Sequence, residues 1–321
     1  MFNILGSACK KGALGIREIS CSEAAKGNYG QISAKLLLNQ VDYSLLWFSY
    51  IHSPFGGLHC ASFFGIIEIV AGLIETEHYD IDERDFSGRT PLAWATFCGH
   101  EEAVNVLLGQ EGVNPNKPDN LGRTPLSLAA LKGHGGVVDI LLRRDDVNPD
   151  KPDIYGETPL LIAASYGYEG VVKILLGREG VNPDKPDDCG RTPLSFAVEE
   201  GHEGVAKLLL EREEVSPDEP DNCGITALWI AASNGHEELV KILLGREDVD
   251  PDKPDNGGRT PLSIAVQEGN ERVVKILLGR KEVDPDQPDN HGRTPLSYAR
   301  RRYPMMVDLP QPRKMATTGK I

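Results

Sequence analysis

Apolar and polar positions recur along the chain with a fixed period of 34 residues. Each copy begins at a threonine, followed by a leucine and an alanine at fixed positions, and every copy except the last also carries a glycine and a leucine pair. A period in this range predicts a solenoid, in which each copy buries its apolar side against the next. The threonines that mark the copies are Thr90, Thr124, Thr158, Thr192, Thr226, Thr260 and Thr294.

The residues of a single copy predict a turn, two short helices and an extended loop. The segment 119–122 (Asp-Asn-Leu-Gly) suits a tight turn, Thr124 suits a helix N-cap, and Pro125 suits the first helical position. Gly133 ends the first helix, and the apolar residues within 137–142 give the second helix an apolar stripe. The prolines that follow remove backbone donors and keep the loop extended. The expected fold class is therefore all-α.

The chain is predicted to have three regions. Residues 1–52 are expected to form a degenerate helical segment that caps the array. Residues 53–302 form the array itself, about seven repeats and a truncated last one. Residues 303–321 are expected to be a disordered tail, because they contain three prolines and no apolar period.

The recurring residues resemble the ankyrin repeat. The resemblance rests on Thr-Pro-Leu-x-x-Ala, then Gly-His, Val-Val-x-x-Leu-Leu and Val-Asn, and it covers about residues 53–302. It implies an ankyrin-repeat solenoid, and the 34-residue period resembles the ankyrin arrays common in fungal proteins. The copy that shows the pattern most fully has Thr124, Pro125, Leu126, Ala129, Ala130, Gly133, His134, Val137, Val138, Leu141, Leu142, Val147 and Asn148.

One position departs from the family's pattern. The family has a histidine after Thr-Pro-Leu, and only the degenerate first copy keeps it, as His59. A serine there can keep a local hydrogen bond. Leu161 and Trp229 are expected not to replace the polar, structural role of the histidine. The residues at this position in the other copies are Ala93, Ser127, Leu161, Ser195, Trp229, Ser263 and Ser297.

Charge and hydropathy narrow the classes of partner. The 34 Lys and Arg against 48 Asp and Glu give a formal charge of −14, which argues against binding to a phosphate backbone. The most apolar run, residues 63–74, contains Glu68 and is too short to cross a bilayer. The first residues lack the pattern of a secretory signal. We expect no nucleic acid and no membrane as partners, and a cytoplasmic location with the nucleus as the alternative.

The residue types that carry catalysis or metal binding do not converge on a site. Neighbouring copies stack about 10 Å apart, too far for their histidines to share a zinc ion, so the Gly-His histidines are expected to be structural. Cys189 and Cys223 occupy equivalent turns that are too distant for a disulfide, and a reactive thiol at either remains an alternative. No catalytic residue, metal or cofactor is therefore expected. The histidines concerned are His100, His134, His202 and His236.

The family resemblance implies a concave binding face, formed by residues around each turn glycine and at the end of each first helix. Apolar and aromatic side chains concentrate at these positions in the first half of the array, and such side chains are enriched in binding hot spots. The candidate partner-binding residues are Phe86, Arg89, Phe97, Leu121, Arg123, Leu131, Ile154, Tyr155, Tyr166 and Arg191.

Two further sets of residues have a defined expectation. The arginines after the turn glycines allow two interpretations: a stripe that faces an acidic partner, or separate pairs with neighbouring aspartates worth about 0–1 kcal/mol each. A large side chain on the inner side of each first helix is expected to lie in the core. The arginines are Arg89, Arg123, Arg191, Arg259 and Arg293, and the core row is Trp94, Leu128, Ile162, Phe196, Ile230, Ile264 and Tyr298.

The sequence thus favours a non-catalytic protein–protein interaction scaffold that binds another protein along the concave ankyrin groove. The chain is expected to be a monomer. Two alternatives stay open. One is an accessory or regulatory protein of a larger fungal system, connected with signalling, a nucleotide switch or metabolism. The other is an enzyme that uses the groove.

Overall fold

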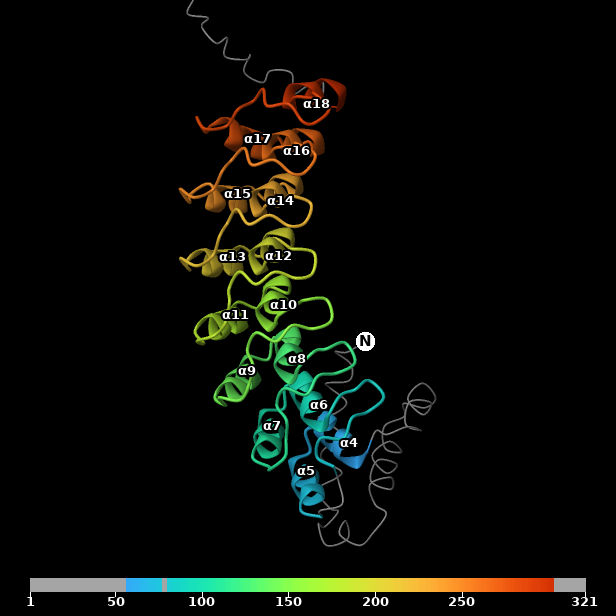
Figure 1. Ribbon diagram of the computed structural model, residues 1–321. Helices are drawn as coiled ribbons and strands as arrows, with labels where there is room; N and C mark the ends of the chain where they lie inside the picture. The colour runs from blue at the N-terminus through green and yellow to red at the C-terminus, as the bar shows by residue number, and fades with distance from the viewer. Residues whose placement is uncertain (1–55, 77–79, 303–321) are drawn as a thin grey trace, which may run out of the picture. The chain divides into compact units, whose positions relative to one another are not determined.

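The computed structural model describes residues 56–76 and 80–302, and in this part of the chain every regular element is a helix (Figure 1). The all-α class predicted from the sequence is therefore confirmed. The predictions for residues 1–52 and 303–321 lie outside the described residues. No helix of the described part is long and apolar enough to span a membrane.

In the described part of the chain all helices except the last come in pairs, and each pair corresponds to one copy of the sequence repeat. A first helix and a second helix are joined by a short turn, and a longer loop leads to the next pair. The first helices are α4 (Gly57–Phe64), α6 (Pro91–Cys98), α8 (Pro125–Lys132), α10 (Pro159–Ser165), α12 (Pro193–Glu199), α14 (Ala227–Asn234), α16 (Pro261–Glu268) and α18 (Pro295–Arg302). The second helices are α5 (Ile67–Ile74), α7 (Glu101–Leu108), α9 (Gly135–Leu142), α11 (Glu169–Leu176), α13 (Glu203–Leu210), α15 (Glu237–Leu243) and α17 (Glu271–Leu278).

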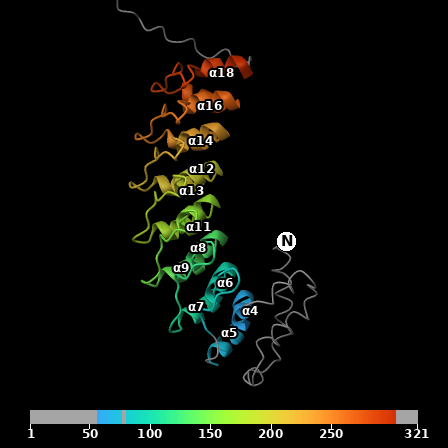
Figure 2. The same ribbon diagram turned by 45° about the vertical axis from the view of Figure 1, so that its right-hand side comes forward.

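The described residues divide into two compact units. The first unit contains the residues up to Ile162 together with Lys173–Val181, and the second contains Ala163–Val172 and the residues from Asn182 onward. In the first unit α4, α6 and α8 pack in one row and α5, α7 and α9 in another (Figure 2). In the second unit α12, α14, α16 and α18 form one row, and α13, α15 and α17 the other. Each row is the stacking that the 34-residue period predicts.

The recurring threonine starts most first helices as an N-cap. Thr90 and Thr124 have extended backbone conformations, and their hydroxyl oxygens accept the backbone N–H of Ala93 and Ser127 at 3.2 Å. A proline follows at the first helical position, where no backbone donor is needed. The helix that lacks this proline, α14, keeps the cap from Thr226.

A glycine ends most first helices, and a histidine from the next copy lies against it. Gly99 has φ +79°, and the Nε2 of His134 donates to the carbonyl oxygen of Phe97 at 3.2 Å. The other three histidines bind equivalent carbonyl oxygens 37 residues upstream at 2.9–3.4 Å. These contacts confirm the structural role predicted for the histidines, which link consecutive repeats.

Replacing Gly99 with alanine is expected to lower the free energy of unfolding by more than the same change at Gly112. Both glycines have positive φ, so a side chain costs about 1–2 kcal/mol at either position. A Cβ at Gly99 would lie 2.7 Å from the imidazole of His134, whereas a Cβ at Gly112 meets no atom within 4 Å. Urea denaturation of the two variants should give the larger loss for Gly99→Ala, and equal losses would contradict the helix–histidine packing.

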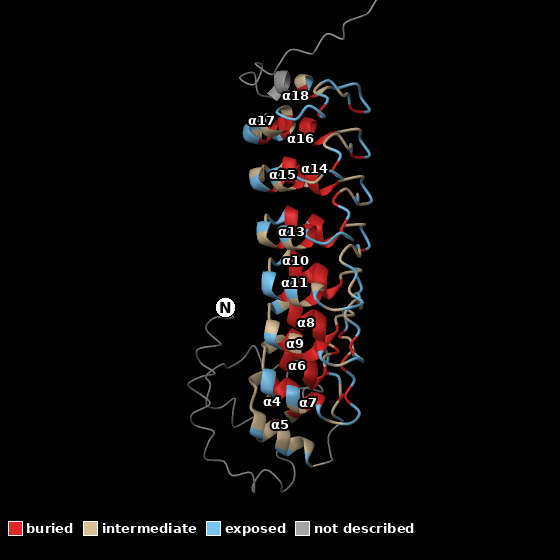
Figure 3. Ribbon diagram, turned by 90° about the vertical axis from the view of Figure 1, so that its left-hand side faces the viewer, coloured by how far each residue is buried: buried red, intermediate tan, exposed pale blue. Residues whose placement is uncertain are grey.

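Both rows of helices contribute buried residues, and most first helices contribute more than the second helix that follows (Figure 3). Leu128, Ile162 and Ile264 are buried, as predicted for the inner row. The other members of that row, however, are only half-buried, so the prediction that the whole row lies in the core is wrong. At three of these positions the ring is covered by an arginine guanidinium instead, a stacking that planar guanidinium groups favour. The four half-buried residues are Trp94, Phe196, Ile230 and Tyr298, and the ring pairs are Arg89 over Trp94, Arg191 over Phe196 and Arg293 over Tyr298.

The expectation that Trp229 cannot replace the family histidine is also wrong. The Nε1 of Trp229 donates to the carbonyl oxygen of Arg259 at 3.2 Å. This bond corresponds to the contact of His59 Nε2 with the carbonyl oxygen of Arg89, also at 3.2 Å and also 30 residues apart in sequence. The indole N–H therefore takes over the link, whereas Leu161 is apolar and buried, as expected.

Candidate protein-binding surface

An aspartate stabilises the turn before each of these first helices by accepting hydrogen bonds from backbone N–H groups of the turn. The Oδ1 of Asp119 accepts the backbone N–H of Leu121 at 2.9 Å and that of Arg123 at 3.0 Å. The same two bonds recur at Asp85, Asp153, Asp187, Asp221, Asp255 and Asp289. We call the two residues that follow the aspartate the turn tip. The hydrogen bonds to the aspartate hold the turn tip in a fixed conformation.

Neighbouring turn tips are hydrogen-bonded to one another. In the first unit the N–H of Asn120 donates to the carbonyl oxygen of Ser87 at 2.9 Å, and the N–H of Ile154 donates to that of Leu121 at 3.0 Å. The side-chain amide of Asn120 also donates to the carbonyl oxygen of Phe86 at 2.9 Å. Ile154 replaces this asparagine in the next repeat, so its apolar side chain takes no part in the bonding.

The turn tips of the first unit present large apolar side chains to solvent. Phe86, Leu121, Ile154 and Tyr155 are 46, 37, 54 and 56 % exposed. We call these four residues the turn-tip row. All four belong to the candidate set predicted from the sequence, and Tyr166 of the second unit, also predicted, is 55 % exposed. Leaving such side chains in water is unfavourable, so a patch of this kind is typical of an interaction site.

The remaining predicted apolar residues differ in exposure. Phe97 and Leu131 are half-buried, and the ring of Phe97 lies under the charged groups of Arg89 and Lys132, 4.5 and 4.6 Å from its centre. In the second unit the ring of Tyr166 stacks on that of Tyr168 with their centres 6.0 Å apart.

Most arginines after the turn glycines pair with the aspartate of their own turn. The Nη2 of Arg123 lies 2.8 Å from Asp119, and that of Arg191 lies 2.9 Å from Asp187. Arg259 and Arg293 pair in the same way with Asp255 and Asp289. Of the two interpretations that the sequence allowed, the structure therefore shows the pairing with aspartate.

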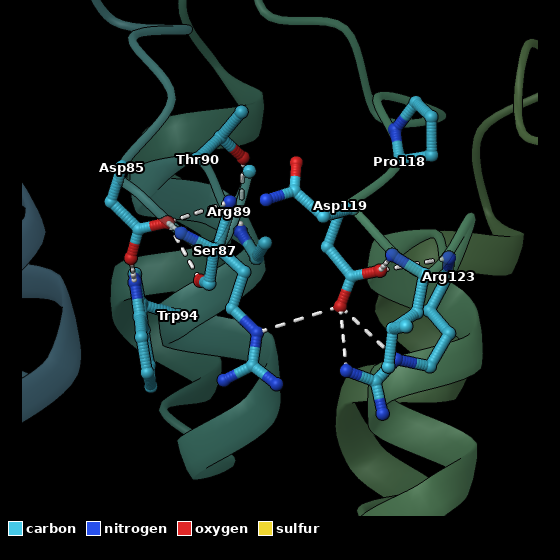
Figure 4. Close-up of polar contacts among 12 residues, drawn as sticks. Asp85, Ser87, Arg89, Thr90, Trp94, Pro118, Asp119 and Arg123 are labelled. Carbon is cyan, nitrogen blue, oxygen red and sulfur yellow. Dashed lines mark hydrogen bonds and ion pairs between the residues drawn. The ribbon is translucent and has the colours of Figure 1, made fainter.

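Arg89 is the exception, since it pairs with the aspartate of the next turn and not with that of its own (Figure 4). The Nε1 of Trp94 donates to the Oδ2 of Asp85 at 2.8 Å. The guanidinium of Arg89 lies instead over the rings of Trp94 and Phe97, 4.5 Å from each centre, and pairs with Asp119 of the next turn. The sequence analysis missed this arrangement. Its signal is Trp94, the one side chain in the inner row with an indole N–H.

Comparison with known proteins identifies the family. A family model described as "Ankyrin repeats (3 copies)" matches residues 22–119, 58–153, 103–187, 144–221, 161–255, 213–289 and 247–309. The chain belongs to the ankyrin-repeat family. The match begins upstream of the array boundary predicted at residue 53, and that boundary stays a prediction.

Solved ankyrin-repeat structures agree with this assignment. The ankyrin repeat domain of Bcl-3, described as a unique member of the IkappaB protein family, matches with a TM-score of 0.61 and 26 % sequence identity. The alignment covers 66 % of this chain and 94 % of that domain. No curated protein matches the chain. Ankyrin repeats are protein-interaction modules, which agrees with the general function predicted from the sequence, whereas the fungal resemblance stays a prediction.

The loops between ankyrin repeats carry a second recurring contact, which the sequence analysis did not predict. The Oδ2 of Asp252 accepts the backbone N–H of Asp284 in the next loop at 2.6 Å, and Asp82, Asp184 and Asp218 make the same contact. Burial raises the pKa of these four carboxyl groups, that of Asp252 to about 6. Asn116 occupies the same position in another repeat, and its Oδ1 accepts the N–H of Asn148 at 2.8 Å.

Replacing Asp252 with asparagine is expected to stabilise the ankyrin repeats at pH 7 and to have little effect near pH 4. Because the folded-state pKa is raised, the neutral carboxyl stabilises the fold below the ordinary value of 3.8, and this contribution is lost as the pH rises through about 6. The amide has no charge to desolvate, so the gain at pH 7 is about 1 kcal/mol after allowance for solvent screening. Urea denaturation at the two pH values measures this difference, and an equal gain at both would contradict it.

The cysteines of the ankyrin repeats have different environments. Cys189 and Cys223 are exposed and free, and their reactivity stays an open prediction. Burial raises the pKa of the Cys60 thiol to about 12. In the described part of the chain, no three His, Cys, Asp or Glu side chains lie close enough together to hold a metal ion.

Proposed function

We propose that the chain is a non-catalytic scaffold that binds a partner protein along the concave face of its ankyrin repeats, with the turn-tip row as the main contact. The observation that best supports this proposal is the exposure of four large apolar side chains on three consecutive turns of the first unit. Aromatic and aliphatic side chains on a rigid support are the usual centre of a protein–protein interface.

The equivalent positions of the second unit support this choice by contrast. The turn tips there carry Asp188 with Cys189, Asn222 with Cys223, and Asn256 with Gly257. Their backbones are fastened by the same aspartate contacts. Apolar side chains are therefore not needed to form the turn, and their presence in the first unit favours a role in binding.

The proposal includes a monomeric chain, a cytoplasmic location and no catalytic activity. The alternatives of an accessory protein of a larger system and of an enzyme find no specific support in the described residues. Tyr166 and Arg191, in the second unit, are proposed as additional contacts.

Affinity capture with matched variants tests the proposal. The native chain and a variant with serine at all four positions of the turn-tip row would be immobilised at equal amounts and exposed to lysate of the source cell. Quantitative mass spectrometry should recover one or more proteins with the native chain that the variant loses. Recovery of the same proteins in the same amounts with both chains would contradict the proposed surface.

A further inference from the structure

Two arginines of the first unit share a single carboxylate. The Nε and Nη2 of Arg123 lie 3.0 and 2.8 Å from the Oδ2 of Asp119, and the Nε of Arg89 lies 3.6 Å from the same oxygen. The other carboxylate oxygen of Asp119 accepts two backbone N–H groups of its own turn. Arg89 and Arg123 therefore share one paired carboxylate, while the charge of Asp85 acts on Arg89 without an ion pair (Figure 4).

Arg89 forms its ion pair with Asp119 and not with the carboxylate of its own turn. Asp85 accepts the N–H and hydroxyl of Ser87, the N–H of Arg89 and the indole N–H of Trp94. The guanidinium of Arg89 lies over two aromatic rings, its side chain is 12 % exposed, and its buried Nε has no hydrogen-bond partner among the described residues. A buried cation with unmade hydrogen bonds is energetically costly.

A neighbouring cation increases the local charge. The side chain of Arg84 donates to the carbonyl oxygens of Gly88 and Pro118 and to the Oδ1 of Asn120, all of which are neutral acceptors. Burial and the proximity of Arg123 lower the pKa of Arg89, although a guanidinium remains charged at neutral pH. Three guanidinium groups, those of Arg84, Arg89 and Arg123, therefore belong to two turns whose aspartates, Asp85 and Asp119, supply two carboxylates.

The second unit provides the contrast. Arg191, Arg259 and Arg293 stand at the same position of their repeats, and each pairs with the aspartate of its own turn. The unbalanced charge of the first unit lies in the turns that present Phe86 and Leu121 to solvent. Apolar contact surface and an unsatisfied cation therefore occur together in the first unit.

We propose that the cluster of Arg89, Asp119 and Arg123 receives a carboxylate side chain of the partner, and that the partner segment is a peptide with an aspartate or glutamate flanked by apolar residues. The inference rests on the proposed function of the turn-tip row, which would contact the apolar flanks. A guanidinium presents its donors in a fork that matches a carboxylate, so an acidic side chain of the partner would supply a third carboxylate for the three guanidinium groups. The sequence left a stripe of arginines as an alternative to separate pairs; this proposal confines the acidic contact to one cluster.

Selection from a displayed library of random short peptides tests the inference. The full chain would be immobilised at physiological salt, and the enriched peptides should share an acidic residue between apolar ones. The most enriched peptide would then be synthesised with a fluorescent label, together with a version in which the acidic residue is replaced by its amide. Fluorescence anisotropy should show at least about tenfold weaker binding of the amide peptide, the loss expected for a charge-assisted hydrogen bond.

Variants of the chain identify the site of the carboxylate. Arg89→Gln should weaken binding of the acidic peptide at least about tenfold and leave binding of the amide peptide almost unchanged, because the two changes remove the same contact. Arg259→Gln, at the same position of a repeat in the second unit and outside the proposed contacts, is the matched control and should bind like the native chain. Circular dichroism verifies folding, and if Arg89→Gln does not fold, Arg89→Lys replaces it and should also weaken binding of the acidic peptide, since it keeps the charge without the fork.

The outcomes separate this inference from the proposed function. Enriched peptides without an acidic residue, no enrichment at all, or equal affinity of the acidic peptide for the native chain and Arg89→Gln would each overturn the inference. If apolar peptides are enriched and Ile154→Ala with Tyr155→Ala abolishes their binding, the turn-tip row still binds and only the carboxylate site fails. Peptides that depend on neither set of residues would reject both proposals.

Discussion

Alanine at both Ile154 and Tyr155 is expected to weaken partner binding about 100-fold or more while the chain stays as stable as the native protein. Both side chains are more than half exposed, so their removal leaves no cavity in the core. Truncating a central apolar anchor costs about 2 kcal/mol or more in an interface, which supports the size of the effect for two neighbouring residues. Isothermal titration with a protein recovered by the affinity capture measures the loss.

The matched control for this double variant lies in the second unit. Asn222→Ala with Cys223→Ala changes the equivalent turn tip, whose side chains are exposed and polar or small. This control should bind with native affinity, and both double variants should unfold at the same urea concentration as the native chain. Native affinity in the Ile154 and Tyr155 variant, or equal losses in both variants, would show that the turn-tip row is not the contact.

Replacing Leu141 with alanine is expected to lower the free energy of unfolding by about 2–5 kcal/mol. Leu141 in α9 is fully buried, and α9 packs against α7 and α8 of the first unit. Removal of a buried leucine side chain loses its transfer free energy and leaves a cavity that short helices held at both ends fill only in part. Because each repeat is stabilised mainly by its neighbours, the urea transition should also broaden.

Leu121→Ala is the matched control, since the same atoms are removed from a turn tip that is 37 % exposed. It should change stability by less than about 0.5 kcal/mol, the usual limit for surface substitutions, and it should weaken partner binding. Leu141→Ala, by contrast, should bind normally under conditions in which it remains folded. Equal destabilisation by the two leucine substitutions would contradict the assignment of core and surface.

The local rules of the repeat explain how much of the fold could be predicted from the sequence. Thr124, Pro125 and Gly133 each act within a few residues, so a helix start and a helix end follow directly from them. The turn-tip row could be identified for a related reason. The same turn recurs in every repeat, so a large apolar side chain at its tip stands out against the polar or small residues at the equivalent positions of other repeats.

The contacts that sequence analysis missed depend on competition between side chains. Arg89 pairs with Asp119 where Trp94 donates to Asp85, whereas Arg293 pairs with Asp289 although Tyr298 donates to the same carboxylate oxygen. Trp229 has no imidazole, but its indole N–H reaches the backbone carbonyl oxygen of Arg259, at the repeat position that the histidine binds in the first copy. Such choices depend on side-chain geometry across neighbouring turns and helices, which a periodic pattern does not contain.

Site-specific photo-crosslinking tests the central claim most directly. A photoreactive amino acid would replace Asn120, which lies between Phe86 and Leu121 in the tips of the first unit, or Glu102, an exposed residue of α7. On irradiation in the source cell, the chain labelled at Asn120 should form a covalent adduct with a partner protein, and the chain labelled at Glu102 should not. An adduct that forms only from Glu102, or none from Asn120 while a partner is still captured, would contradict binding through the turn tips.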